Sequence, residues 1–210
     1  NGATFTQPLG GTLTAQPALL NGGATLTLVG SNTLSALEIN NVGGTTAPTV
    51  TAGTLTLNGG ITATSSNLGS TSTIAGTLDF GGASRTLSIS PVTINGAAVS
   101  PRTPTLIISA LIQNAGTLNV NGGGVLQLGS SVSTFTGSLN VNAGGLVLAN
   151  NSSITSLFGG GSGLVSGATL YTGPLGMGTL KMAAGTRLLV DDGQSRTVVN
   201  PVVFEGNTLI

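Results

Sequence analysis

The chain has 210 residues, but only five are Lys or Arg and five are Asp or Glu, so its formal net charge is zero. Such a chain offers no basic surface for nucleic acid or for an anionic membrane. It has no Cys and no His, which excludes disulfides, thiolate metal sites and catalysis by either residue. Leu, Val and Ile nevertheless recur at short intervals between Gly, Thr, Ser and Asn, so we expect a folded chain with a buried core.

The apolar runs are too short to cross a membrane as a helix. A spanning helix needs about 20 mostly apolar residues, whereas runs such as Leu106-Ile107-Ile108 are soon interrupted. The first residues lack the basic and apolar regions of a signal peptide, and residues 208–210 have the character of a strand. We therefore expect a mature or excised segment of a longer protein.

Short alternating segments that begin at or near Gly predict β-strands along the whole chain. In these segments Leu, Val, Phe or Met alternates with Thr, Asn or another polar residue, which places the apolar side chains on one face. Asn-Gly pairs at 58–59, 95–96 and 121–122 predict tight turns with positive φ. No stretch has helical periodicity. The clearest strand segments are residues 24–28, 53–57, 76–80, 116–120, 137–141 and 178–182.

Two nested repeats indicate the architecture. Residues 117–125 resemble residues 138–146 at an offset of 21, and residues 84–96 resemble residues 195–206 at an offset of 111 that falls to 110. An offset of 21 suits one coil of a β-solenoid, and the longer unit then contains about five coils. We predict an all-β, right-handed parallel β-helix over residues 1–210, with roughly ten coils and a length near 50 Å. Inward Leu, Val and Ile form its core, and no segment resembles a capping helix.

The sequence from Gly124 to Asn150 resembles the autotransporter-associated β-strand repeat of bacterial surface proteins. Its pattern is a Gly-x-Leu-x-Leu strand, an aromatic with Thr-Gly, and a strand ending in Asn-Ala-Gly before a second x-Leu-x-Leu. The resemblance implies a secreted, cell-surface passenger that serves as a stalk, adhesin or matrix fibre, although the family's signal and translocator barrel are not found in this sequence. The matching residues are Gly124, Leu126, Leu128, Phe135, Thr136, Gly137, Val141, Asn142, Ala143, Gly144, Leu146 and Leu148.

The carboxylates available for catalysis are few and scattered. Glycoside hydrolases hold two carboxyl groups about 5–5.5 or 6.5–9.5 Å apart. Asp79 and Asp191 lie about five coils apart, roughly 24 Å along the axis, and the neighbours Asp191 and Asp192 face opposite sides if extended. The remaining carboxylate pair is Asp191 or Asp192 with Glu205. Glu38 has no second carboxylate near it in the sequence. We interpret residues 191–195 as a polar turn, with a weak Ca²⁺ site or a catalytic site as alternatives, and assign no catalytic, cofactor or metal residue.

Three smaller sequence features bear on possible sites. Arg85 and Arg196 occupy the same place in the long repeat, so we expect a shared structural role such as a hydrogen bond to a corner carbonyl. Residues 150–153 are interpreted as turn residues, and Gly159–Gly163 as a loop. Thr-x-Thr pairs suggest a surface array, but they do not recur once per coil in the second half. The pairs are at 12 and 14, 25 and 27, 54 and 56, and 71 and 73.

Two non-enzymatic hypotheses explain these patterns. In the first, the segment is a passive stalk of a large surface protein. In the second, it assembles into an extracellular filament, because charges and caps that normally block edge-to-edge addition are scarce. The alternatives are a β-helical polysaccharide lyase or hydrolase, a glycan-binding module, and a Thr-array surface binder. The expected partners are further copies or neighbouring repeats, or a host or matrix glycan or protein, in an extracellular location.

Overall fold

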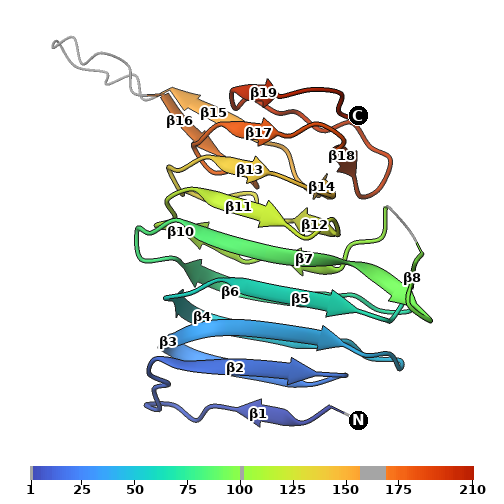
Figure 1. The fold of residues 1–210 in the computed structure, drawn as a ribbon. Coiled ribbons are helices and arrows are strands. Elements are labelled where there is room, and N and C mark those ends of the chain that lie inside the picture. The colour runs from blue at the N-terminus through green and yellow to red at the C-terminus, as the bar shows by residue number, and fades with distance from the viewer. Residues whose placement is uncertain (1, 100–101, 157–168) are drawn as a thin grey trace, which may run out of the picture.

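A computed structural model describes residues 2–99, 102–156 and 169–210, and all regular structure within these ranges is β-strand. Strands from successive turns of the chain stack in parallel from the N-terminal end to the C-terminal end (Figure 1). The chain is therefore an all-β parallel β-helix, as the sequence predicts. Among the described residues no helix is long and apolar enough to span a membrane. The loop expected at Gly159–Gly163 lies outside the described residues.

The stack has three faces, which we number in the order in which β3 passes through them. The third face is turned toward the viewer in Figure 1. Its strands pair in parallel from coil to coil, and within the described chain the strands at its two ends, β2 and β19, have a partner on one side only. They are β2 (Gln16–Asn21), the end of β3 (Thr25–Asn41), β5 (Ile61–Ser65), β7 (Arg85–Ile94), β11 (Leu118–Asn121), β13 (Leu139–Val141), β17 (Leu180–Met182) and β19 (Val202–Phe204).

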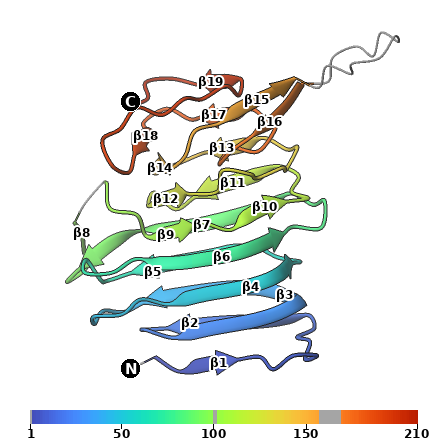
Figure 2. The same ribbon diagram turned by 180° about the vertical axis from the view of Figure 1, so that it is seen from behind.

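The opposite side carries two further rows of strands, the first and second faces, which lie side by side in Figure 2. The first face contains β1 (Thr4–Thr6), the beginnings of β3, β4 (Thr49–Leu57) and β6 (Ser72–Asp79), then β9 (Leu106–Ile108), β12 (Val125–Leu128), β14 (Gly145–Leu148) and β18 (Arg187–Val190). The second face contains later parts of β3, β4 and β6, and then β10 (Leu111–Gln113).

Two antiparallel excursions leave the stack. β7 pairs with β8 (Ala97–Ala98) through a turn in which Asn95 and Gly96 have φ values of 50° and 79°, as the Asn-Gly pair predicts. β15 (Ser153–Ser156) pairs with β16 (Thr169–Thr172) outside the large sheet. Residues 58–59 also turn, but Gly59 does not have the predicted positive φ. Glycine is needed there because a Cβ atom would lie 2.2 Å from the Ser35 carbonyl oxygen.

The number of residues in a coil varies along the stack. Thr25 pairs with Thr49, and Thr49 with Thr73, at intervals of 24 residues. Farther along the same face, Leu126 pairs with Leu146 at an interval of 20. A coil of 21 residues therefore describes only part of the chain, because corners take up or lose residues while the strands stay paired.

The short repeat predicted from the sequence is confirmed in its first part. Residues 118–120 pair with residues 139–141 at an offset of 21. After the next corner Val125 pairs with Gly145, and not with Leu146 as the sequence alignment predicts. The later coil loses one residue at this corner, so the offset falls to 20.

The two segments of the long repeat lie at different places around their coils. Val92 pairs with Ser65 near the end of a third-face strand. Val202 pairs with Leu180 at the start of such a strand, in the column that also contains Arg85. Val202 therefore lies nearer the start of its third-face strand than Val92, the equivalent residue of the first segment, does.

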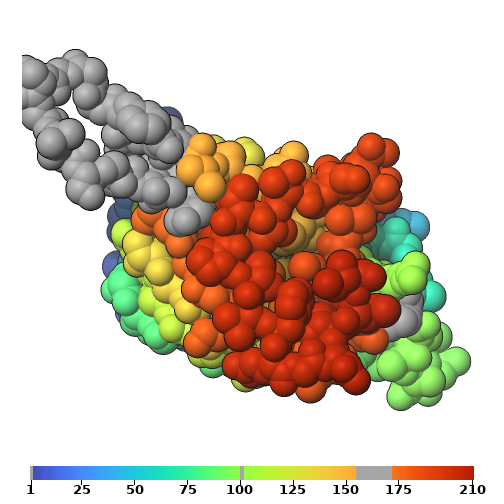
Figure 3. Space-filling model, turned by 90° about the horizontal axis from the view of Figure 1, so that it is seen from above, coloured from blue at the N-terminus to red at the C-terminus, as the bar shows by residue number. Residues whose placement is uncertain are grey.

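The core consists of inward side chains that stack from coil to coil. The Leu, Val, Phe and Met residues of all six predicted strand segments are buried, and full burial of one such side chain stabilises the fold by about 1.5–3 kcal/mol. Figure 3 looks along the axis at the C-terminal end, where residues of the last coils cover the core. One continuous column on the third face consists of Leu37, Ile61, Leu87, Val120, Val141 and Met182.

Near the N-terminal end, the core also contains a polar pair. Gln7 and Asn32 are buried and bind each other through both amides, with an Nε2–Oδ1 distance of 2.7 Å and an Nδ2–Oε1 distance of 2.9 Å. Their oxygens also accept the backbone N–H groups of Val29 and Leu13. Since buried polar groups are costly only when unpaired, these partners allow two amides to occupy the core.

The corner between the first and second faces is built on glycine. Gly76 has a φ of 96°, and a Cβ atom there would lie 1.7 Å from the carbonyl oxygen of Ala52 in the preceding coil. Gly30 turns the corresponding corner of an earlier coil with a φ of 70°, but a Cβ atom at this position would have no other atom within 4 Å. The two glycines therefore share a backbone requirement and differ in steric contact.

We predict that Gly76→Ala destabilises the protein clearly more than Gly30→Ala. Positive φ costs a residue with a Cβ atom about 1–2 kcal/mol at either site, but only Gly76→Ala adds the collision with Ala52. Urea unfolding followed by circular dichroism measures the two free energies. Equal losses would show that coil contact does not constrain this corner.

Candidate functional site

The acidic turn near the C-terminal end is tied to one arginine. Arg196 Nη2 lies 2.6 Å from Asp191 Oδ1 and 2.9 Å from Asp192 Oδ2. The backbone N–H of Gln194 donates to Asp192 Oδ1 at 2.9 Å, which closes the turn on itself. The carboxylates therefore form part of the polar turn that the sequence predicts after β18.

The electrostatics of this turn do not suit a general acid. The Gln194 N–H lowers the pKa of Asp192; desolvation opposes this effect, and the hydrogen bond and charge of Arg196 reinforce it. In return, the hydrogen bond that Arg196 donates to Asp191 raises the pKa of Arg196. A glycosidase acid needs a carboxyl pKa raised toward neutrality, and the pKa of Asp192 is shifted in the opposite direction.

The other acids that the sequence singles out lie at different parts of the coil. Glu205 follows β19 on the third face, whereas Asp191 and Asp192 follow β18 on the first face. Asp79 ends β6 several coils earlier, and Glu38 is exposed within β3. Within residues 2–99, 102–156 and 169–210, no three His, Cys, Asp or Glu side chains are grouped to hold a metal ion.

Arg85 and Arg196 share the role predicted for them. Arg85 Nε donates to the carbonyl oxygen of Leu57 at 3.2 Å, and Arg196 Nε donates to that of Leu148 at 3.3 Å. Each acceptor is the last residue of a strand, β4 or β14. Both arginines therefore hold a chain corner, and the prediction of a hydrogen bond to a corner carbonyl is confirmed.

Asp79 joins two coils through a cluster that the sequence does not reveal. Its Oδ1 accepts the backbone N–H of Gly81 at 2.7 Å, and its Oδ2 accepts Gln113 Nε2 at 2.9 Å and Asn114 Nδ2 at 2.7 Å. Partial burial raises the pKa of Asp79, but the three hydrogen bonds together lower it below its ordinary value. The ionised carboxylate is therefore the form that the fold stabilises.

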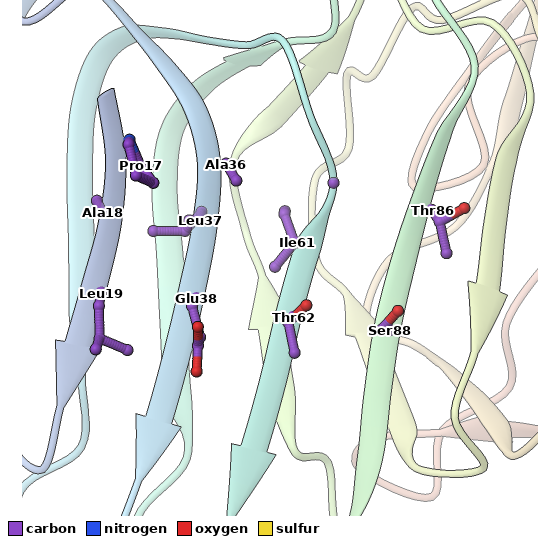
Figure 4. Close-up of a pocket in the computed structure, with 11 residues that line it drawn as sticks. Pro17, Ala18, Leu19, Ala36, Leu37, Glu38, Ile61, Thr62, Thr86 and Ser88 are labelled. Atoms are coloured by element: carbon purple, nitrogen blue, oxygen red, sulfur yellow. The ribbon is translucent and has the colours of Figure 1, made fainter. Parts of the chain in front are cut away.

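A shallow groove crosses β2, β3, β5 and β7 on the third face (Figure 4). Its volume is about 450 Å³, and the small residues Ala36 and Gly60 are among those that line it. Glu38 is the only charged residue among those that line it. A single exposed carboxylate without an acid or base partner gives this groove no catalytic pair.

The threonine pairs that the sequence suggests fall on the first and second faces. Thr25 and Thr27 lie on the first face, and Thr54 and Thr56 on the second. Residues 12 and 14 precede them on the second face, where Thr33 bonds to the backbone on either side of position 14. In the last pair Thr73 points outward on the first face, but Thr71 does not belong to a strand.

Comparison with known proteins does not identify a relative. The sequence matches no protein-family model, and neither the curated proteins nor the solved structures contain a significant match. The resemblance to the autotransporter repeat therefore remains a prediction from residues 124–150. The proposed function therefore depends on the geometry of the chain itself.

We predict that Asp79→Asn lowers the free energy of unfolding at pH 7 by about 1–2 kcal/mol, because an amide cannot accept all three donors. Since the folded pKa of Asp79 is below 3.8, the carboxylate's contribution is present above that value and is lost as pH falls through the folded pKa. The difference from wild type should therefore shrink in strong acid. Urea unfolding at pH 7 and in strong acid measures the difference in free energy of unfolding. The exposed Glu38→Gln serves as the control. A difference that persists in acid contradicts the prediction.

Proposed function

We propose that the chain is a non-catalytic rod segment of a secreted or surface-displayed bacterial β-helical protein, acting as a stalk or as a self-assembling fibre. The observation that supports this most directly is the continuous parallel ladder, which runs from β1 to β18 on the first face and from β2 to β19 on the third. Such stacking extends a rod along one axis, and it requires no binding or catalytic site.

The two ends of the stack support continuation by another coil. Within the described chain β1 pairs only with β3, and β19 only with β17, so each leaves a strand edge open. At the N-terminal end a hollow of about 250 Å³ is lined partly by Phe5, Leu13 and Leu26. At the other end Ile210 is 80 % exposed. Open edges beside apolar side chains are the surfaces to which further strands add.

The distribution of charge agrees with this proposal. Strands β1 to β6 contain only two charged residues, Glu38 and Asp79. Natural sheets commonly place Lys or other charges on exposed edges to prevent addition of a second sheet. The N-terminal edge strand, Thr4–Thr6, has no such charge. A neighbouring repeat or a second copy of the chain therefore meets no electrostatic barrier there.

We predict that the isolated segment forms rods whose length increases with protein concentration. Addition of coils buries the exposed apolar ends and pairs the open strand edges. Negative-stain electron microscopy across a dilution series measures the rod lengths. Phe5→Lys places a charge beside the N-terminal edge and should shorten the rods, while Leu68→Lys, at an exposed loop position, should not. Monodisperse short rods at every concentration would contradict self-assembly and leave the stalk as the proposed function.

The alternative of a polysaccharide lyase or hydrolase has a separate test. Asp191 and Asp192 are both held by Arg196, so we expect no new reducing or unsaturated ends after incubation with polygalacturonate and other acidic glycans. Chromatography and absorbance measure those ends. Cleavage that disappeared in Asp191→Ala, and not in Glu38→Gln, would overturn the non-catalytic proposal.

A further inference from the structure

Figure 2 shows the strands of the first and second faces, and the pairing register aligns hydroxyl side chains in columns along their N-terminal half. On the first face, the coil pairings align the outer residues of β1, β3, β4 and β6 into two columns. On the second face, the later parts of β3, β4 and β6 align two more. We call these residues the threonine face: Thr4, Thr6, Thr25, Thr27, Ser31, Thr33, Thr49, Thr51, Thr54, Thr56, Thr73 and Thr77.

The twelve residues of the threonine face point away from the core and are uncharged, although Asp79 follows Thr56 in its second-face column. Its members alternate with buried residues such as Leu26, Val50 and Leu55. Thr49 and Thr73 make only long hydrogen bonds of 3.4 Å to nearby carbonyl oxygens. Within the described chain, the other hydroxyls of the face make no side-chain hydrogen bond. The columns therefore present hydroxyl and methyl groups outward.

These groups are held in position by the fold. Paired strands place corresponding threonines about 4.7–4.9 Å apart along the axis, and residues two apart on a strand lie about 6.6–6.8 Å apart. Threonine is branched at Cβ, which restricts its χ1 angle. β4 and β6 contribute to both faces, but a corner with shifts of register at Leu28/Ser31 and Ala52/Thr54 separates the two. Within each face the array is therefore regular in two directions before any ligand binds.

The spacing matches that of ordered water. When each water forms tetrahedral hydrogen bonds of about 2.75 Å, second-neighbour oxygens lie about 4.5 Å apart and the puckered layers repeat about every 7.3 Å. These distances agree with the two spacings of the threonine face to within about a tenth. An uncharged lattice also complements the first-face columns, which contain no charged residue.

We propose that the threonine face binds ice. Its hydroxyls join the hydrogen-bonded lattice while its methyl groups sit between them, at positions where liquid water is poorly bound. On the first face the array covers four coils and ends where Ala75 and Ile107 replace threonine, and on the second face the column of Thr56 ends at Asp79. This inference does not depend on whether the rod polymerises.

A crystalline polysaccharide is the other uncharged surface with a regular repeat, but the threonine face lacks what such a ligand requires. Flat sugar rings are commonly held by aromatic side chains, whose rings offer large rigid contact areas. None of the twelve residues of the face is aromatic. Phe5, the aromatic residue nearest to it, occupies the inward position of β1, where it pairs with buried Leu26.

The test uses Thr51→Lys, an exposed position in the middle of the array. Wild type should lower the freezing point of a solution below its melting point, reshape ice crystals and enter growing polycrystalline ice. Thr51→Lys should reduce the freezing-point difference several-fold, because a long charged side chain separates the face from the lattice. Nanolitre osmometry and ice-affinity partitioning measure these effects, and circular dichroism checks that the fold is retained.

The matched control is Thr62→Lys, which adds the same charge at an exposed threonine of β5 on the third face. It should behave as wild type. A wild-type protein without a freezing-point difference, or equal losses in the two variants, overturns the proposal. Binding to powdered chitin or cellulose that is lost in Thr51→Lys, without any effect on ice, overturns it in favour of a polysaccharide surface.

Discussion

Hydrogen bonding between successive coils is the constraint on which the rest of this structure depends. Parallel pairing sets a fixed distance of about 4.8 Å between one coil and the next, so no corner can be thicker than that distance. Gly76 shows the consequence, because its α-carbon lies too close to Ala52 for a side chain. The same distance brings inward Leu, Ile and Val into continuous contact. A chain with few charges can therefore remain folded through repetition of a single contact.

The constraint acts outside the core as well. In the C-terminal half it aligns asparagines, so that Asn140 Nδ2 donates to Asn119 Oδ1 at 3.1 Å and Asn142 Nδ2 to Asn121 Oδ1 at 2.9 Å. In the N-terminal half it aligns hydroxyls that do not bind one another. The first arrangement joins amide groups to one another within the protein, and the second leaves hydroxyls directed at solvent. One backbone geometry thus supports two surfaces of different chemistry.

The sequence was sufficient for the strands and their inward faces, because alternation in segments such as residues 53–57 depends only on local geometry. Coil length was predicted less well, since a corner gains or loses a residue without disturbing the ladder. For this reason the alignment of Thr25 with Thr49 was not visible at an offset of 21. The Asp79 cluster was also missed, because Gln113 lies 34 residues away and belongs to no repeat. The shared role of Arg85 and Arg196 follows from their common place in the long repeat, although the two segments lie at different places around their coils.

The two antiparallel excursions show how such a rod accommodates additional chain. Strand pairing continues across both: Leu118 follows Arg85 in register despite β8 between them, and Leu139 is followed by Leu180 despite β15 and β16. Length inserted at a corner therefore costs the ladder no hydrogen bonds. The two excursions can therefore change in size and chemistry during evolution while the parallel stack stays constant. A foreign peptide grafted at either excursion is displayed at a known height along the axis.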